Sequence, residues 1–336
     1  MSGRLVLVLI ALAVVVGGAA LLYQRQEAAR QPDSAALLGQ RIFGELQAAE
    51  VAAIRIVEPD GKLTIEKKGD AWVIPEREGF PADVKAVRDF VLKALELKVG
   101  QSEPIGDRDR ARLNLDESGT RVEFAGADGK PLAAMVVGKK YFRREVADPS
   151  KATADGRFLQ VPDKTGVVYI VSDPLEQASA ESAKWIDKTA FKIEKVKSLQ
   201  VRFPDGHRWR VERAREDADW KLEGARPGEK LEITKANAAT YTLSLLELAD
   251  VPPQDAKETG LAKPIRLDAT TLEGASYVVR VGDKKGDNYY VSFESTSDKP
   301  IDKRLSRYTL LIPQAKLDDA LKRRDELLEK KEDGKS

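Results

Sequence analysis

The chain has 336 residues, of which 33% are charged and 6% aromatic, and its 56 basic and 55 acidic side chains leave a formal charge of +1. This length accommodates two domains with separate cores, and the lack of a basic excess argues against nucleic acid as a partner. Cysteine is absent, which excludes disulfides, thiolate nucleophiles, cysteine-ligated metals and lipid attachment through an N-terminal cysteine.

The N-terminal segment, residues 1–30, is predicted to be a transmembrane anchor with its flank. Leu5–Tyr23 is an uncharged run of 19 residues, which at about 1.5 Å per helical residue just spans a ~30 Å hydrocarbon core. A cleavable signal peptide is the alternative, since Gly18-Ala19-Ala20 resembles a cleavage site. The apolar run continues past it, which favours an uncleaved span through which the chain binds the inner membrane. We therefore predict a single-pass inner-membrane protein with a cytoplasmic N-terminus and a periplasmic bulk.

Residues 31–46 are predicted to form a polar linker and a short helix. The linker includes Gln31-Pro32-Asp33-Ser34, where a proline disfavours a continuing helix. Apolar residues then recur at helical spacing, namely Leu37, Leu38, Ile42, Phe43 and Leu46.

One pattern occurs twice in the remaining chain. Residues 51–75 read VAAIRIVEPDGKLTIEKKGDAWVIP, and residues 196–222 read VKSLQVRFPDGHRWRVERAREDADWKL. Each copy has an alternating apolar run, a Pro-Asp-Gly turn, a second alternating run and a tryptophan, Trp72 or Trp220. Alternation around such a turn predicts a β-hairpin. We interpret the two copies as a tandem duplication, with one repeat at 47–185 and another at 186–315.

The first repeat is predicted to combine antiparallel hairpins with helices. A helix is expected from Pro81-Ala82-Asp83 to Gly100, since proline and aspartate are typical of a helix start. A second helix is expected at Asp173–Ala183, and Gly138–Gly156 is expected to be irregular. Strands are predicted at Ile54–Ile56, Leu63–Ile65, Ala71–Ile74, Arg121–Phe124, Leu132–Val137, Phe158–Val161 and Val167–Val171.

The second repeat is predicted to follow the same plan. A helix is expected from about Thr234 to Leu248, and residues 316–336 are expected to form a charged C-terminal helix and tail, with the helix at Leu317–Glu332. Strands are predicted at Leu199–Phe203, Trp209–Val211, Ile265–Thr270, Tyr277–Val281, Tyr289–Phe293 and Arg307–Ile312. The predicted fold class is therefore α+β, with an N-terminal transmembrane helix followed by two repeated units of antiparallel hairpins packed with helices.

The repeated hairpin, tryptophan and helix resemble the bacterial family called domain of unknown function 4340, over roughly Leu46–Phe293. The resemblance implies an exported single-span protein associated with a gliding-motility-type ABC transport system, and hence an accessory role with ABC transporter components as partners. It implies no catalytic or binding residue. The motifs that carry it are Ile54-x-Ile56, Pro59-Asp60-Gly61, Trp72, Pro81-Ala82-Asp83 and Asp187-Lys188.

Candidate catalytic and ligand-binding residues are few. His207 is the single histidine and follows a Pro-Asp-Gly turn, so we expect an exposed hairpin residue rather than a base or metal ligand. The segments GADG (126–129) and GDKKG (282–286) lack the spacing of phosphate loops. The acidic loops 148–155 and 283–287 lack the ligand series of a calcium loop. We therefore expect no catalytic, cofactor-binding or metal site, and the binding residues are unknown.

The functional prediction is a membrane-anchored, non-catalytic accessory protein of an envelope ABC-type transport assembly, acting by protein–protein contact. One alternative is an envelope enzyme acting on a glycan or peptide through a carboxylate pair, which 55 acidic residues leave open. Another is a glycan-binding module that stacks sugars on tryptophan. We expect core positions for Trp72, Trp209 and Trp220, and a junction position for Trp185.

Overall fold

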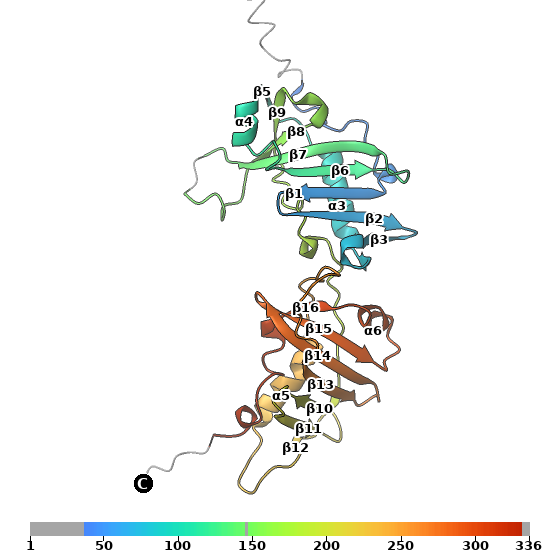
Figure 1. Ribbon diagram of the computed structural model, residues 1–336, viewed down its shortest axis with the longest axis vertical. Helices are drawn as coiled ribbons and strands as arrows, with labels where there is room; N and C mark the ends of the chain where they lie inside the picture. Colours follow the sequence, from blue (N-terminus) through green and yellow to red (C-terminus); the bar gives the residue numbers. More distant parts are fainter. Residues whose placement is uncertain (1–36, 145–146, 331–336) are drawn as a thin grey trace, which may run out of the picture. The chain divides into compact units, whose positions relative to one another are not determined.

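The computed structural model describes residues 37–144 and 147–330 (Figure 1). Its strands form two antiparallel sheets, and its described helices have 13 residues or fewer. The predicted α+β class is therefore wrong, and the fold is mostly antiparallel β with few short helices. The described α-helices are α3 (Val84–Glu96), α4 (Asp107–Arg112), α5 (Ile233–Tyr241) and α6 (Pro300–Leu305).

Membrane insertion was part of the predicted fold and location. Within the described ranges, no helix is both long and apolar enough to cross a bilayer. The longest, α3, has 13 residues and rises about 20 Å against the ~30 Å of a hydrocarbon core. The described residues therefore give no support to the predicted single-pass inner-membrane protein with a transmembrane helix. The predicted span Leu5–Tyr23 lies outside the described residues, as do 31–36 of the predicted linker.

The first sheet has nine strands, with both edges formed by short strands. In sheet order these are β4 (Phe80–Pro81), β3 (Ala71–Ile74), β2 (Gly61–Lys68), β1 (Ala53–Glu58), β6 (Thr120–Ala125), β7 (Pro131–Tyr141), β8 (Gly156–Gln160), β9 (Val167–Val171) and β5 (Gln101–Pro104).

The alternating pattern of β1 determines which face of the first sheet is buried. Ile54 lies opposite Phe124 and Ile56 opposite Val122, and all four side chains are fully buried. The apolar stripe of α3 packs on this face, where the rings of Phe90 and Phe124 lie 5.8 Å apart. The predicted helix and hairpin strands at these positions are confirmed.

The second sheet has seven strands. In sheet order these are β12 (Lys221–Leu222), β11 (Arg208–Glu212), β10 (Val196–Arg202), β13 (Ile265–Thr271), β14 (Ser276–Lys285), β15 (Asn288–Ser295) and β16 (Leu310–Pro313).

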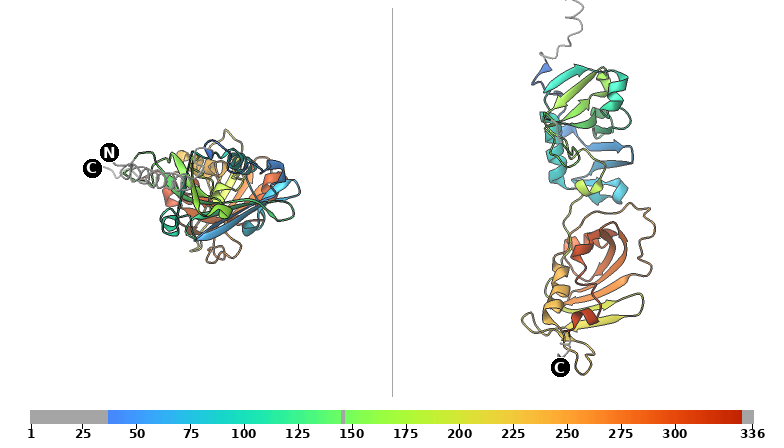
Figure 2. Two further views of the ribbon diagram at one scale, coloured as in Figure 1. Left: turned by 90° about the horizontal axis from the view of Figure 1, so that it is seen from above. Right: turned by 90° about the vertical axis from the view of Figure 1, so that its left-hand side faces the viewer.

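One row of directly opposed residues crosses the second sheet and forms the centre of its core. Each member is at most 3% exposed, and α5 lies along this face (Figure 2), where it buries Ala236 and Ala239. Burial of such side chains stabilises by about 1.5–3 kcal/mol each. We call this the apolar row, and its members are Trp209, Val201, Leu267, Val279 and Phe293.

The two sheets share the same strand order. From β2 through β1, β6, β7 and β8 to β9, each strand has a counterpart in the order β11, β10, β13, β14, β15, β16. Both sheets also shift register at a corresponding place, between Val137 and Lys140 in β7 and between Val281 and Lys284 in β14. The repeat boundaries 47–185 and 186–315 stay predictions, because they concern duplication of the sequence.

A glycine lies at each of these register shifts because another backbone segment passes against it. The Lys139 N–H donates to the Leu113 carbonyl at 2.9 Å, and the Asp283 N–H donates to the Thr259 carbonyl at 2.8 Å. A Cβ on the preceding residue, Gly138 or Gly282, would overlap that same carbonyl oxygen. Glycine is therefore required by close approach rather than by backbone angle.

By contact, the described chain divides into two compact units. One takes in residues up to 64 together with 87–180, and the other takes in 65–86 together with 181–330. The first unit carries α3 from Val87 onward, and the second carries α5 and α6.

Three predicted helices are wrong. Residues 38–46 form turns and an isolated bridge between Arg41 and Lys98, and 173–183 form turns ending in a short 3₁₀ helix at Ser182–Lys184. Residues 317–332 form, over their described part, mostly turns with one 3₁₀ turn at Asp325–Leu327. In each segment only some of the apolar residues are buried, and turns can bury residues at helical spacing as well as a helix can.

The segment Gln314–Leu328, which we call the C-terminal strap, is fastened to the second unit by side chains. The Trp209 indole donates to the Lys322 carbonyl at 2.8 Å. Arg323 lies 2.7 Å from Asp205 and stacks over the Phe203 ring at 4.1 Å. Arg324 donates to both carboxylate oxygens of Glu229, at 2.9 and 2.7 Å. The strap therefore belongs to the folded unit.

Replacing Gly282 with alanine tests the close approach. Gly282→Ala should lower the free energy of unfolding by roughly 1–3 kcal/mol, the usual cost of overpacking, measured by urea denaturation. Gly166→Ala is the control, because a Cβ at Gly166 has no neighbour within 4 Å. Equal stability of the two variants would contradict the proposed packing constraint.

Acid should loosen the strap at Glu229. Hydrogen bonds from Arg324 lower the pKa of Glu229 from 4.5 to about 2. A lowered folded-state pKa gives stability that is complete above about pH 4.5 and is lost as the pH falls to about 2. The melting temperature of wild type should therefore exceed that of Glu229→Gln at neutral pH, with the difference vanishing towards pH 2. The exposed Glu117→Gln should show no such trend, and a pH-independent difference for Glu229→Gln would refute the assignment.

Candidate functional site

His207 lies on an exposed hairpin turn, as predicted. Its side chain is 72% exposed, and Nδ1 lies 3.2 Å from Asp205 Oδ1. The His207 backbone N–H also donates to that oxygen at 3.0 Å. Residues 37–144 and 147–330 contain no cluster of three or more histidine, cysteine or acidic side chains that could hold a metal ion.

The tryptophans differ in burial. Trp185, Trp209 and Trp220 are buried, so their faces are closed to a sugar ring. Trp72 is only half-buried, and the expectation of a core position for it is wrong. The reason is its place on β3, which lies next to the edge strand β4. Because β4 has only two residues, it covers little of β3.

An open groove of about 1120 Å³ lies in the second unit, and we take it as the candidate site. It is formed where β10 and β14 begin and where β13 and β15 end, and α5 supplies one wall. Residues 192–196 form part of the lining. This segment is anchored by Phe191, whose ring stacks on Phe293 at 3.9 Å, and by the Ile193 N–H, which donates to the Leu243 carbonyl at 3.0 Å.

The charges along the groove are balanced, and five of its eight charged side chains form the following ion pairs. Lys195 and Glu273 lie 2.8 Å apart, and Lys299 and Glu194 lie 3.6 Å apart. Asp298 pairs with Lys303 at 2.7 Å. The groove therefore has no excess of one sign to select a charged small molecule. In full, its basic residues are Lys192, Lys195, Arg213 and Lys299, and its acidic residues are Glu194, Glu216, Glu273 and Asp298.

Arg213 is held in place within the groove by its surroundings. Its Nε donates to the Val196 carbonyl at 2.8 Å, and Nη1 donates to the Glu216 carbonyl at 2.6 Å. The guanidinium lies 4.5 Å from the centre of the Trp220 ring, a cation–π geometry. These contacts fix the Arg213 side chain, which therefore supports the wall of the groove.

The groove wall formed by α5 and the 3₁₀ turn that follows it presents apolar side chains to solvent. Tyr241 is 64% exposed and Leu245 is 46% exposed, although both line the groove. Asn237 lies on the same helix, where its Oδ1 accepts a hydrogen bond from the Trp220 indole at 2.8 Å. The Asn237 amide nitrogen is left as a donor. The groove thus combines an apolar rim with polar walls.

A buried carboxylate lies behind the groove. Tyr277 donates from its hydroxyl to Asp302 Oδ2 at 2.7 Å, and Asp302 is 1% exposed. The other carboxylate oxygen, Oδ1, has no hydrogen-bond partner among the described residues. Burial, with a further contribution from Asp302, raises the pKa of the Tyr277 hydroxyl. Tyr277 is therefore a donor at neutral pH, and it supports the groove floor.

Ion pairing lowers the pKa of two carboxylates in the groove. A hydrogen bond from Lys195 lowers the pKa of Glu273, and one from Lys303 lowers the pKa of Asp298. A general acid at neutral pH needs the opposite, a raised pKa. The arrangement can hold an uncharged or mixed-charge chain by hydrogen bonds and apolar contact.

Sequence reasoning did not find the groove because its lining comes from separated segments. Within the lining, Lys195 has a φ of 49°, an angle that non-glycine residues seldom adopt. That backbone angle cannot be deduced from the residue type.

A family model described as Domain of unknown function (DUF4340) matches residues 72–264. The chain belongs to this family. No curated protein matches the chain, and no solved structure matches it. The DUF4340 match includes the groove residues from Lys192 to Leu245 and ends just before β13.

The floor of the groove in this DUF4340 protein can be tested through its buried tyrosine. Tyr277→Phe removes the one hydrogen bond to Asp302 and should cost about 1–3 kcal/mol of unfolding free energy, the usual cost of an unsatisfied buried group. Tyr241→Phe should cost close to nothing, because Tyr241 is exposed. Chemical denaturation measures both, and equal stabilities would show that the Tyr277 bond is dispensable.

Proposed function

We propose that this DUF4340 protein is a non-catalytic binding protein that acts by protein–protein contact within an ABC-type transport assembly. The groove beside α5 receives an extended segment of the partner. The observation that carries the proposal is the combination of exposed Tyr241 and Leu245 with walls whose charges are balanced and mostly paired. Such a surface gains from covering apolar area and has little to gain from a charged small ligand.

The composition of the groove matches that of a protein interface. Such interfaces combine apolar with polar area and are enriched in tyrosine. A bound chain can cover Tyr241 and Leu245 while its peptide groups accept from the Asn237 amide and from the Lys192 ammonium. Because the segment 192–195 and Arg213 are anchored by their own contacts, binding loses little conformational entropy.

Catalysis and glycan binding find less support. The lowered pKa values of Glu273 and Asp298 keep both side chains ionised, whereas a glycosidase needs one protonated carboxyl group. Sugar stacking needs exposed aromatic faces, and three of the four tryptophans are buried. The assignment to a transport assembly comes from the family resemblance.

A photocrosslinking amino acid at Tyr241 tests the proposal in cells that express the full chain. The expected adduct joins the chain to a protein component of an ABC transport system. The same amino acid at Leu132, which is 39% exposed in the first unit, should give no such adduct. Tyr241→Ala with Leu245→Ala should abolish adducts formed from a crosslinker at Asn237.

Purified protein provides the opposing readout. The proposal expects no turnover of peptidoglycan or of a peptide mixture by wild type. Two results together would replace the binding proposal with the enzyme alternative. They are turnover that is lost on Glu273→Gln or Asp298→Asn, and the absence of a protein adduct at Tyr241.

A further inference from the structure

Four arginines lie side by side across the second sheet, on the face opposite the apolar row. Arg208 in β11 is directly opposite Arg202 in β10, Arg202 is opposite Arg266 in β13, and Arg266 is opposite Arg280 in β14. We call these four residues the arginine row. Neighbouring strands lie about 4.8 Å apart, so three strand spacings bring four positive charges within roughly 15 Å.

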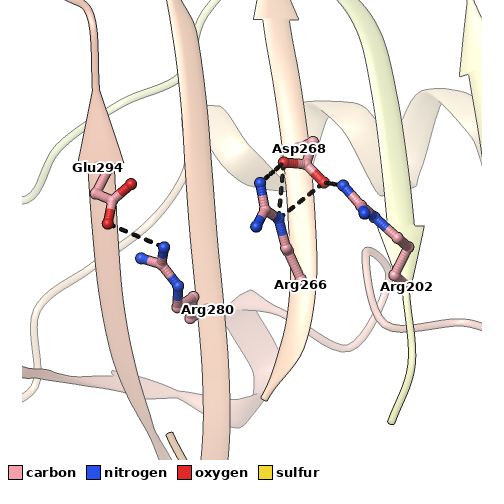
Figure 3. A network of polar contacts seen from close by, with 5 residues as sticks. All are labelled: Arg202, Arg266, Asp268, Arg280 and Glu294. Carbon is pink, nitrogen blue, oxygen red and sulfur yellow. Dashed lines mark hydrogen bonds and ion pairs between the residues drawn. The ribbon is translucent and has the colours of Figure 1, made fainter. Parts of the chain in front are cut away.

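The arginine row is accessible to solvent and is only partly neutralised. Arg202 and Arg266 both donate to the Asp268 carboxylate, at 2.5 and 2.8 Å, and Arg280 donates to Glu294 at 2.9 Å (Figure 3). The side chains of Arg202 and Arg266 are 46% and 40% exposed. Within the described ranges, the structure gives Arg208 no ion pair.

Asp268 forms ion pairs with both Arg202 and Arg266. Burial alone would raise the pKa of Asp268, but hydrogen bonds from Arg266 and Arg202 outweigh burial and hold the pKa below its usual value. The carboxylate is therefore fully ionised at neutral pH, and its single charge is shared between two guanidinium groups. The four arginines of the row exceed their two ion-pair partners, Asp268 and Glu294, by two positive charges.

The fold itself does not require arginine at these positions. The corresponding residues of the first sheet are Val57 in β1, Arg121 in β6 and Val136 in β7, which are also directly opposite one another. One arginine between two valines is thus enough for the same strand arrangement. Like charges placed directly opposite one another destabilise a sheet. The arginine row therefore costs stability that the equivalent first sheet does not lose.

We propose that the arginine row is a docking surface for an acidic segment of a partner protein. Guanidinium groups bind carboxylates with paired hydrogen bonds, and a partner that supplies two or more carboxylates would relieve the repulsion within the row. The face lies opposite the one covered by α5, so it is separate from the groove wall that carries Tyr241 and Leu245. The inference does not depend on the function proposed for the groove.

The spacing of the arginine row matches an acidic helix lying across the strands. Side chains three and four positions apart on a helix are about 5–6 Å from each other, close to the strand spacing of about 4.8 Å. Successive acidic residues on one helical face can therefore each meet a different arginine. In an extended segment, alternate side chains are about 6.6 Å apart, which fits the row less well.

Other anionic partners fit this surface less well. Single-stranded nucleic acid is held by aromatic stacking as well as by charge, and the residues that flank the row on its own face, which include Gln200, Arg210, Asp268, Val278 and Ser292, are not aromatic. The chain as a whole has a formal charge of only +1, which gives no long-range attraction to a polyanion or an anionic membrane.

The test measures binding of a fluorescently labelled, alanine-rich helical peptide with glutamates at every third and fourth position, by fluorescence anisotropy. The reference peptide has glutamine in place of each glutamate. Full-length protein should bind the glutamate peptide at low salt and lose affinity as salt rises, because exposed charges are screened. It should bind the glutamine peptide at least about tenfold more weakly, as expected when charge-assisted hydrogen bonds are lost.

Variants then locate the binding surface. Arg202→Val with Arg280→Val introduces the residues of the first sheet and should weaken binding at least about tenfold, while the melting temperature stays the same or rises. Arg208→Gln with Arg280→Gln should act likewise and provides a second, polar variant. The matched control is Arg108→Gln with Arg307→Gln, which removes two exposed arginines elsewhere and should leave affinity within about twofold.

Three outcomes would overturn the inference. The first is no salt-dependent binding of the glutamate peptide. A second is equal loss of affinity in the row variants and in the control. The third is binding of anionic vesicles or of a single-stranded oligonucleotide, but not of the peptide, through the same arginines. Tyr241→Ala with Leu245→Ala should retain peptide binding, which separates this test from that of the groove.

Discussion

The antiparallel register of the second sheet determines what each of its faces can do. Because side chains alternate along a strand, fixing the apolar row beneath α5 directs the arginine row to the opposite face. A slip of one residue in any strand would bury arginine against α5 and expose its apolar neighbour. Burial of the apolar row thus stabilises the sheet, which offsets the repulsion between four neighbouring arginines.

The groove depends on the same sheet through different contacts. Its walls begin where the strands end, and each wall is fastened to the core by a buried aromatic residue, Phe191 on Phe293 and Arg213 on Trp220. The C-terminal strap adds a further restraint, because Trp209 of the apolar row donates to its backbone. One unit therefore presents two separate surfaces, a neutral groove with an apolar rim and a positively charged sheet face.

The sequence allowed prediction of local features that depend on neighbouring residues. The hairpins around Gly61 and Gly206 and the helix after Asp83 follow from turn chemistry and apolar spacing. The segments 38–46, 173–183 and the described part of 317–332 form turns instead of the expected helices, because helical spacing of apolar residues does not exclude turns. The groove and the arginine row depend on strand register, which joins residues as far apart as Arg202 and Arg266. Alternation alone predicts a strand but not its partner residue.

The account is tested most directly by an NMR titration that follows the side-chain Nε–H signals of the arginines. Adding the acidic helical peptide to the full chain should shift the signals of Arg202, Arg266 and Arg280, and leave that of Arg213 unchanged, since Arg213 supports the groove. Shifts at Arg213 with none in the arginine row, or no shifts at saturating peptide, would contradict the assignment of this sheet face as a docking surface.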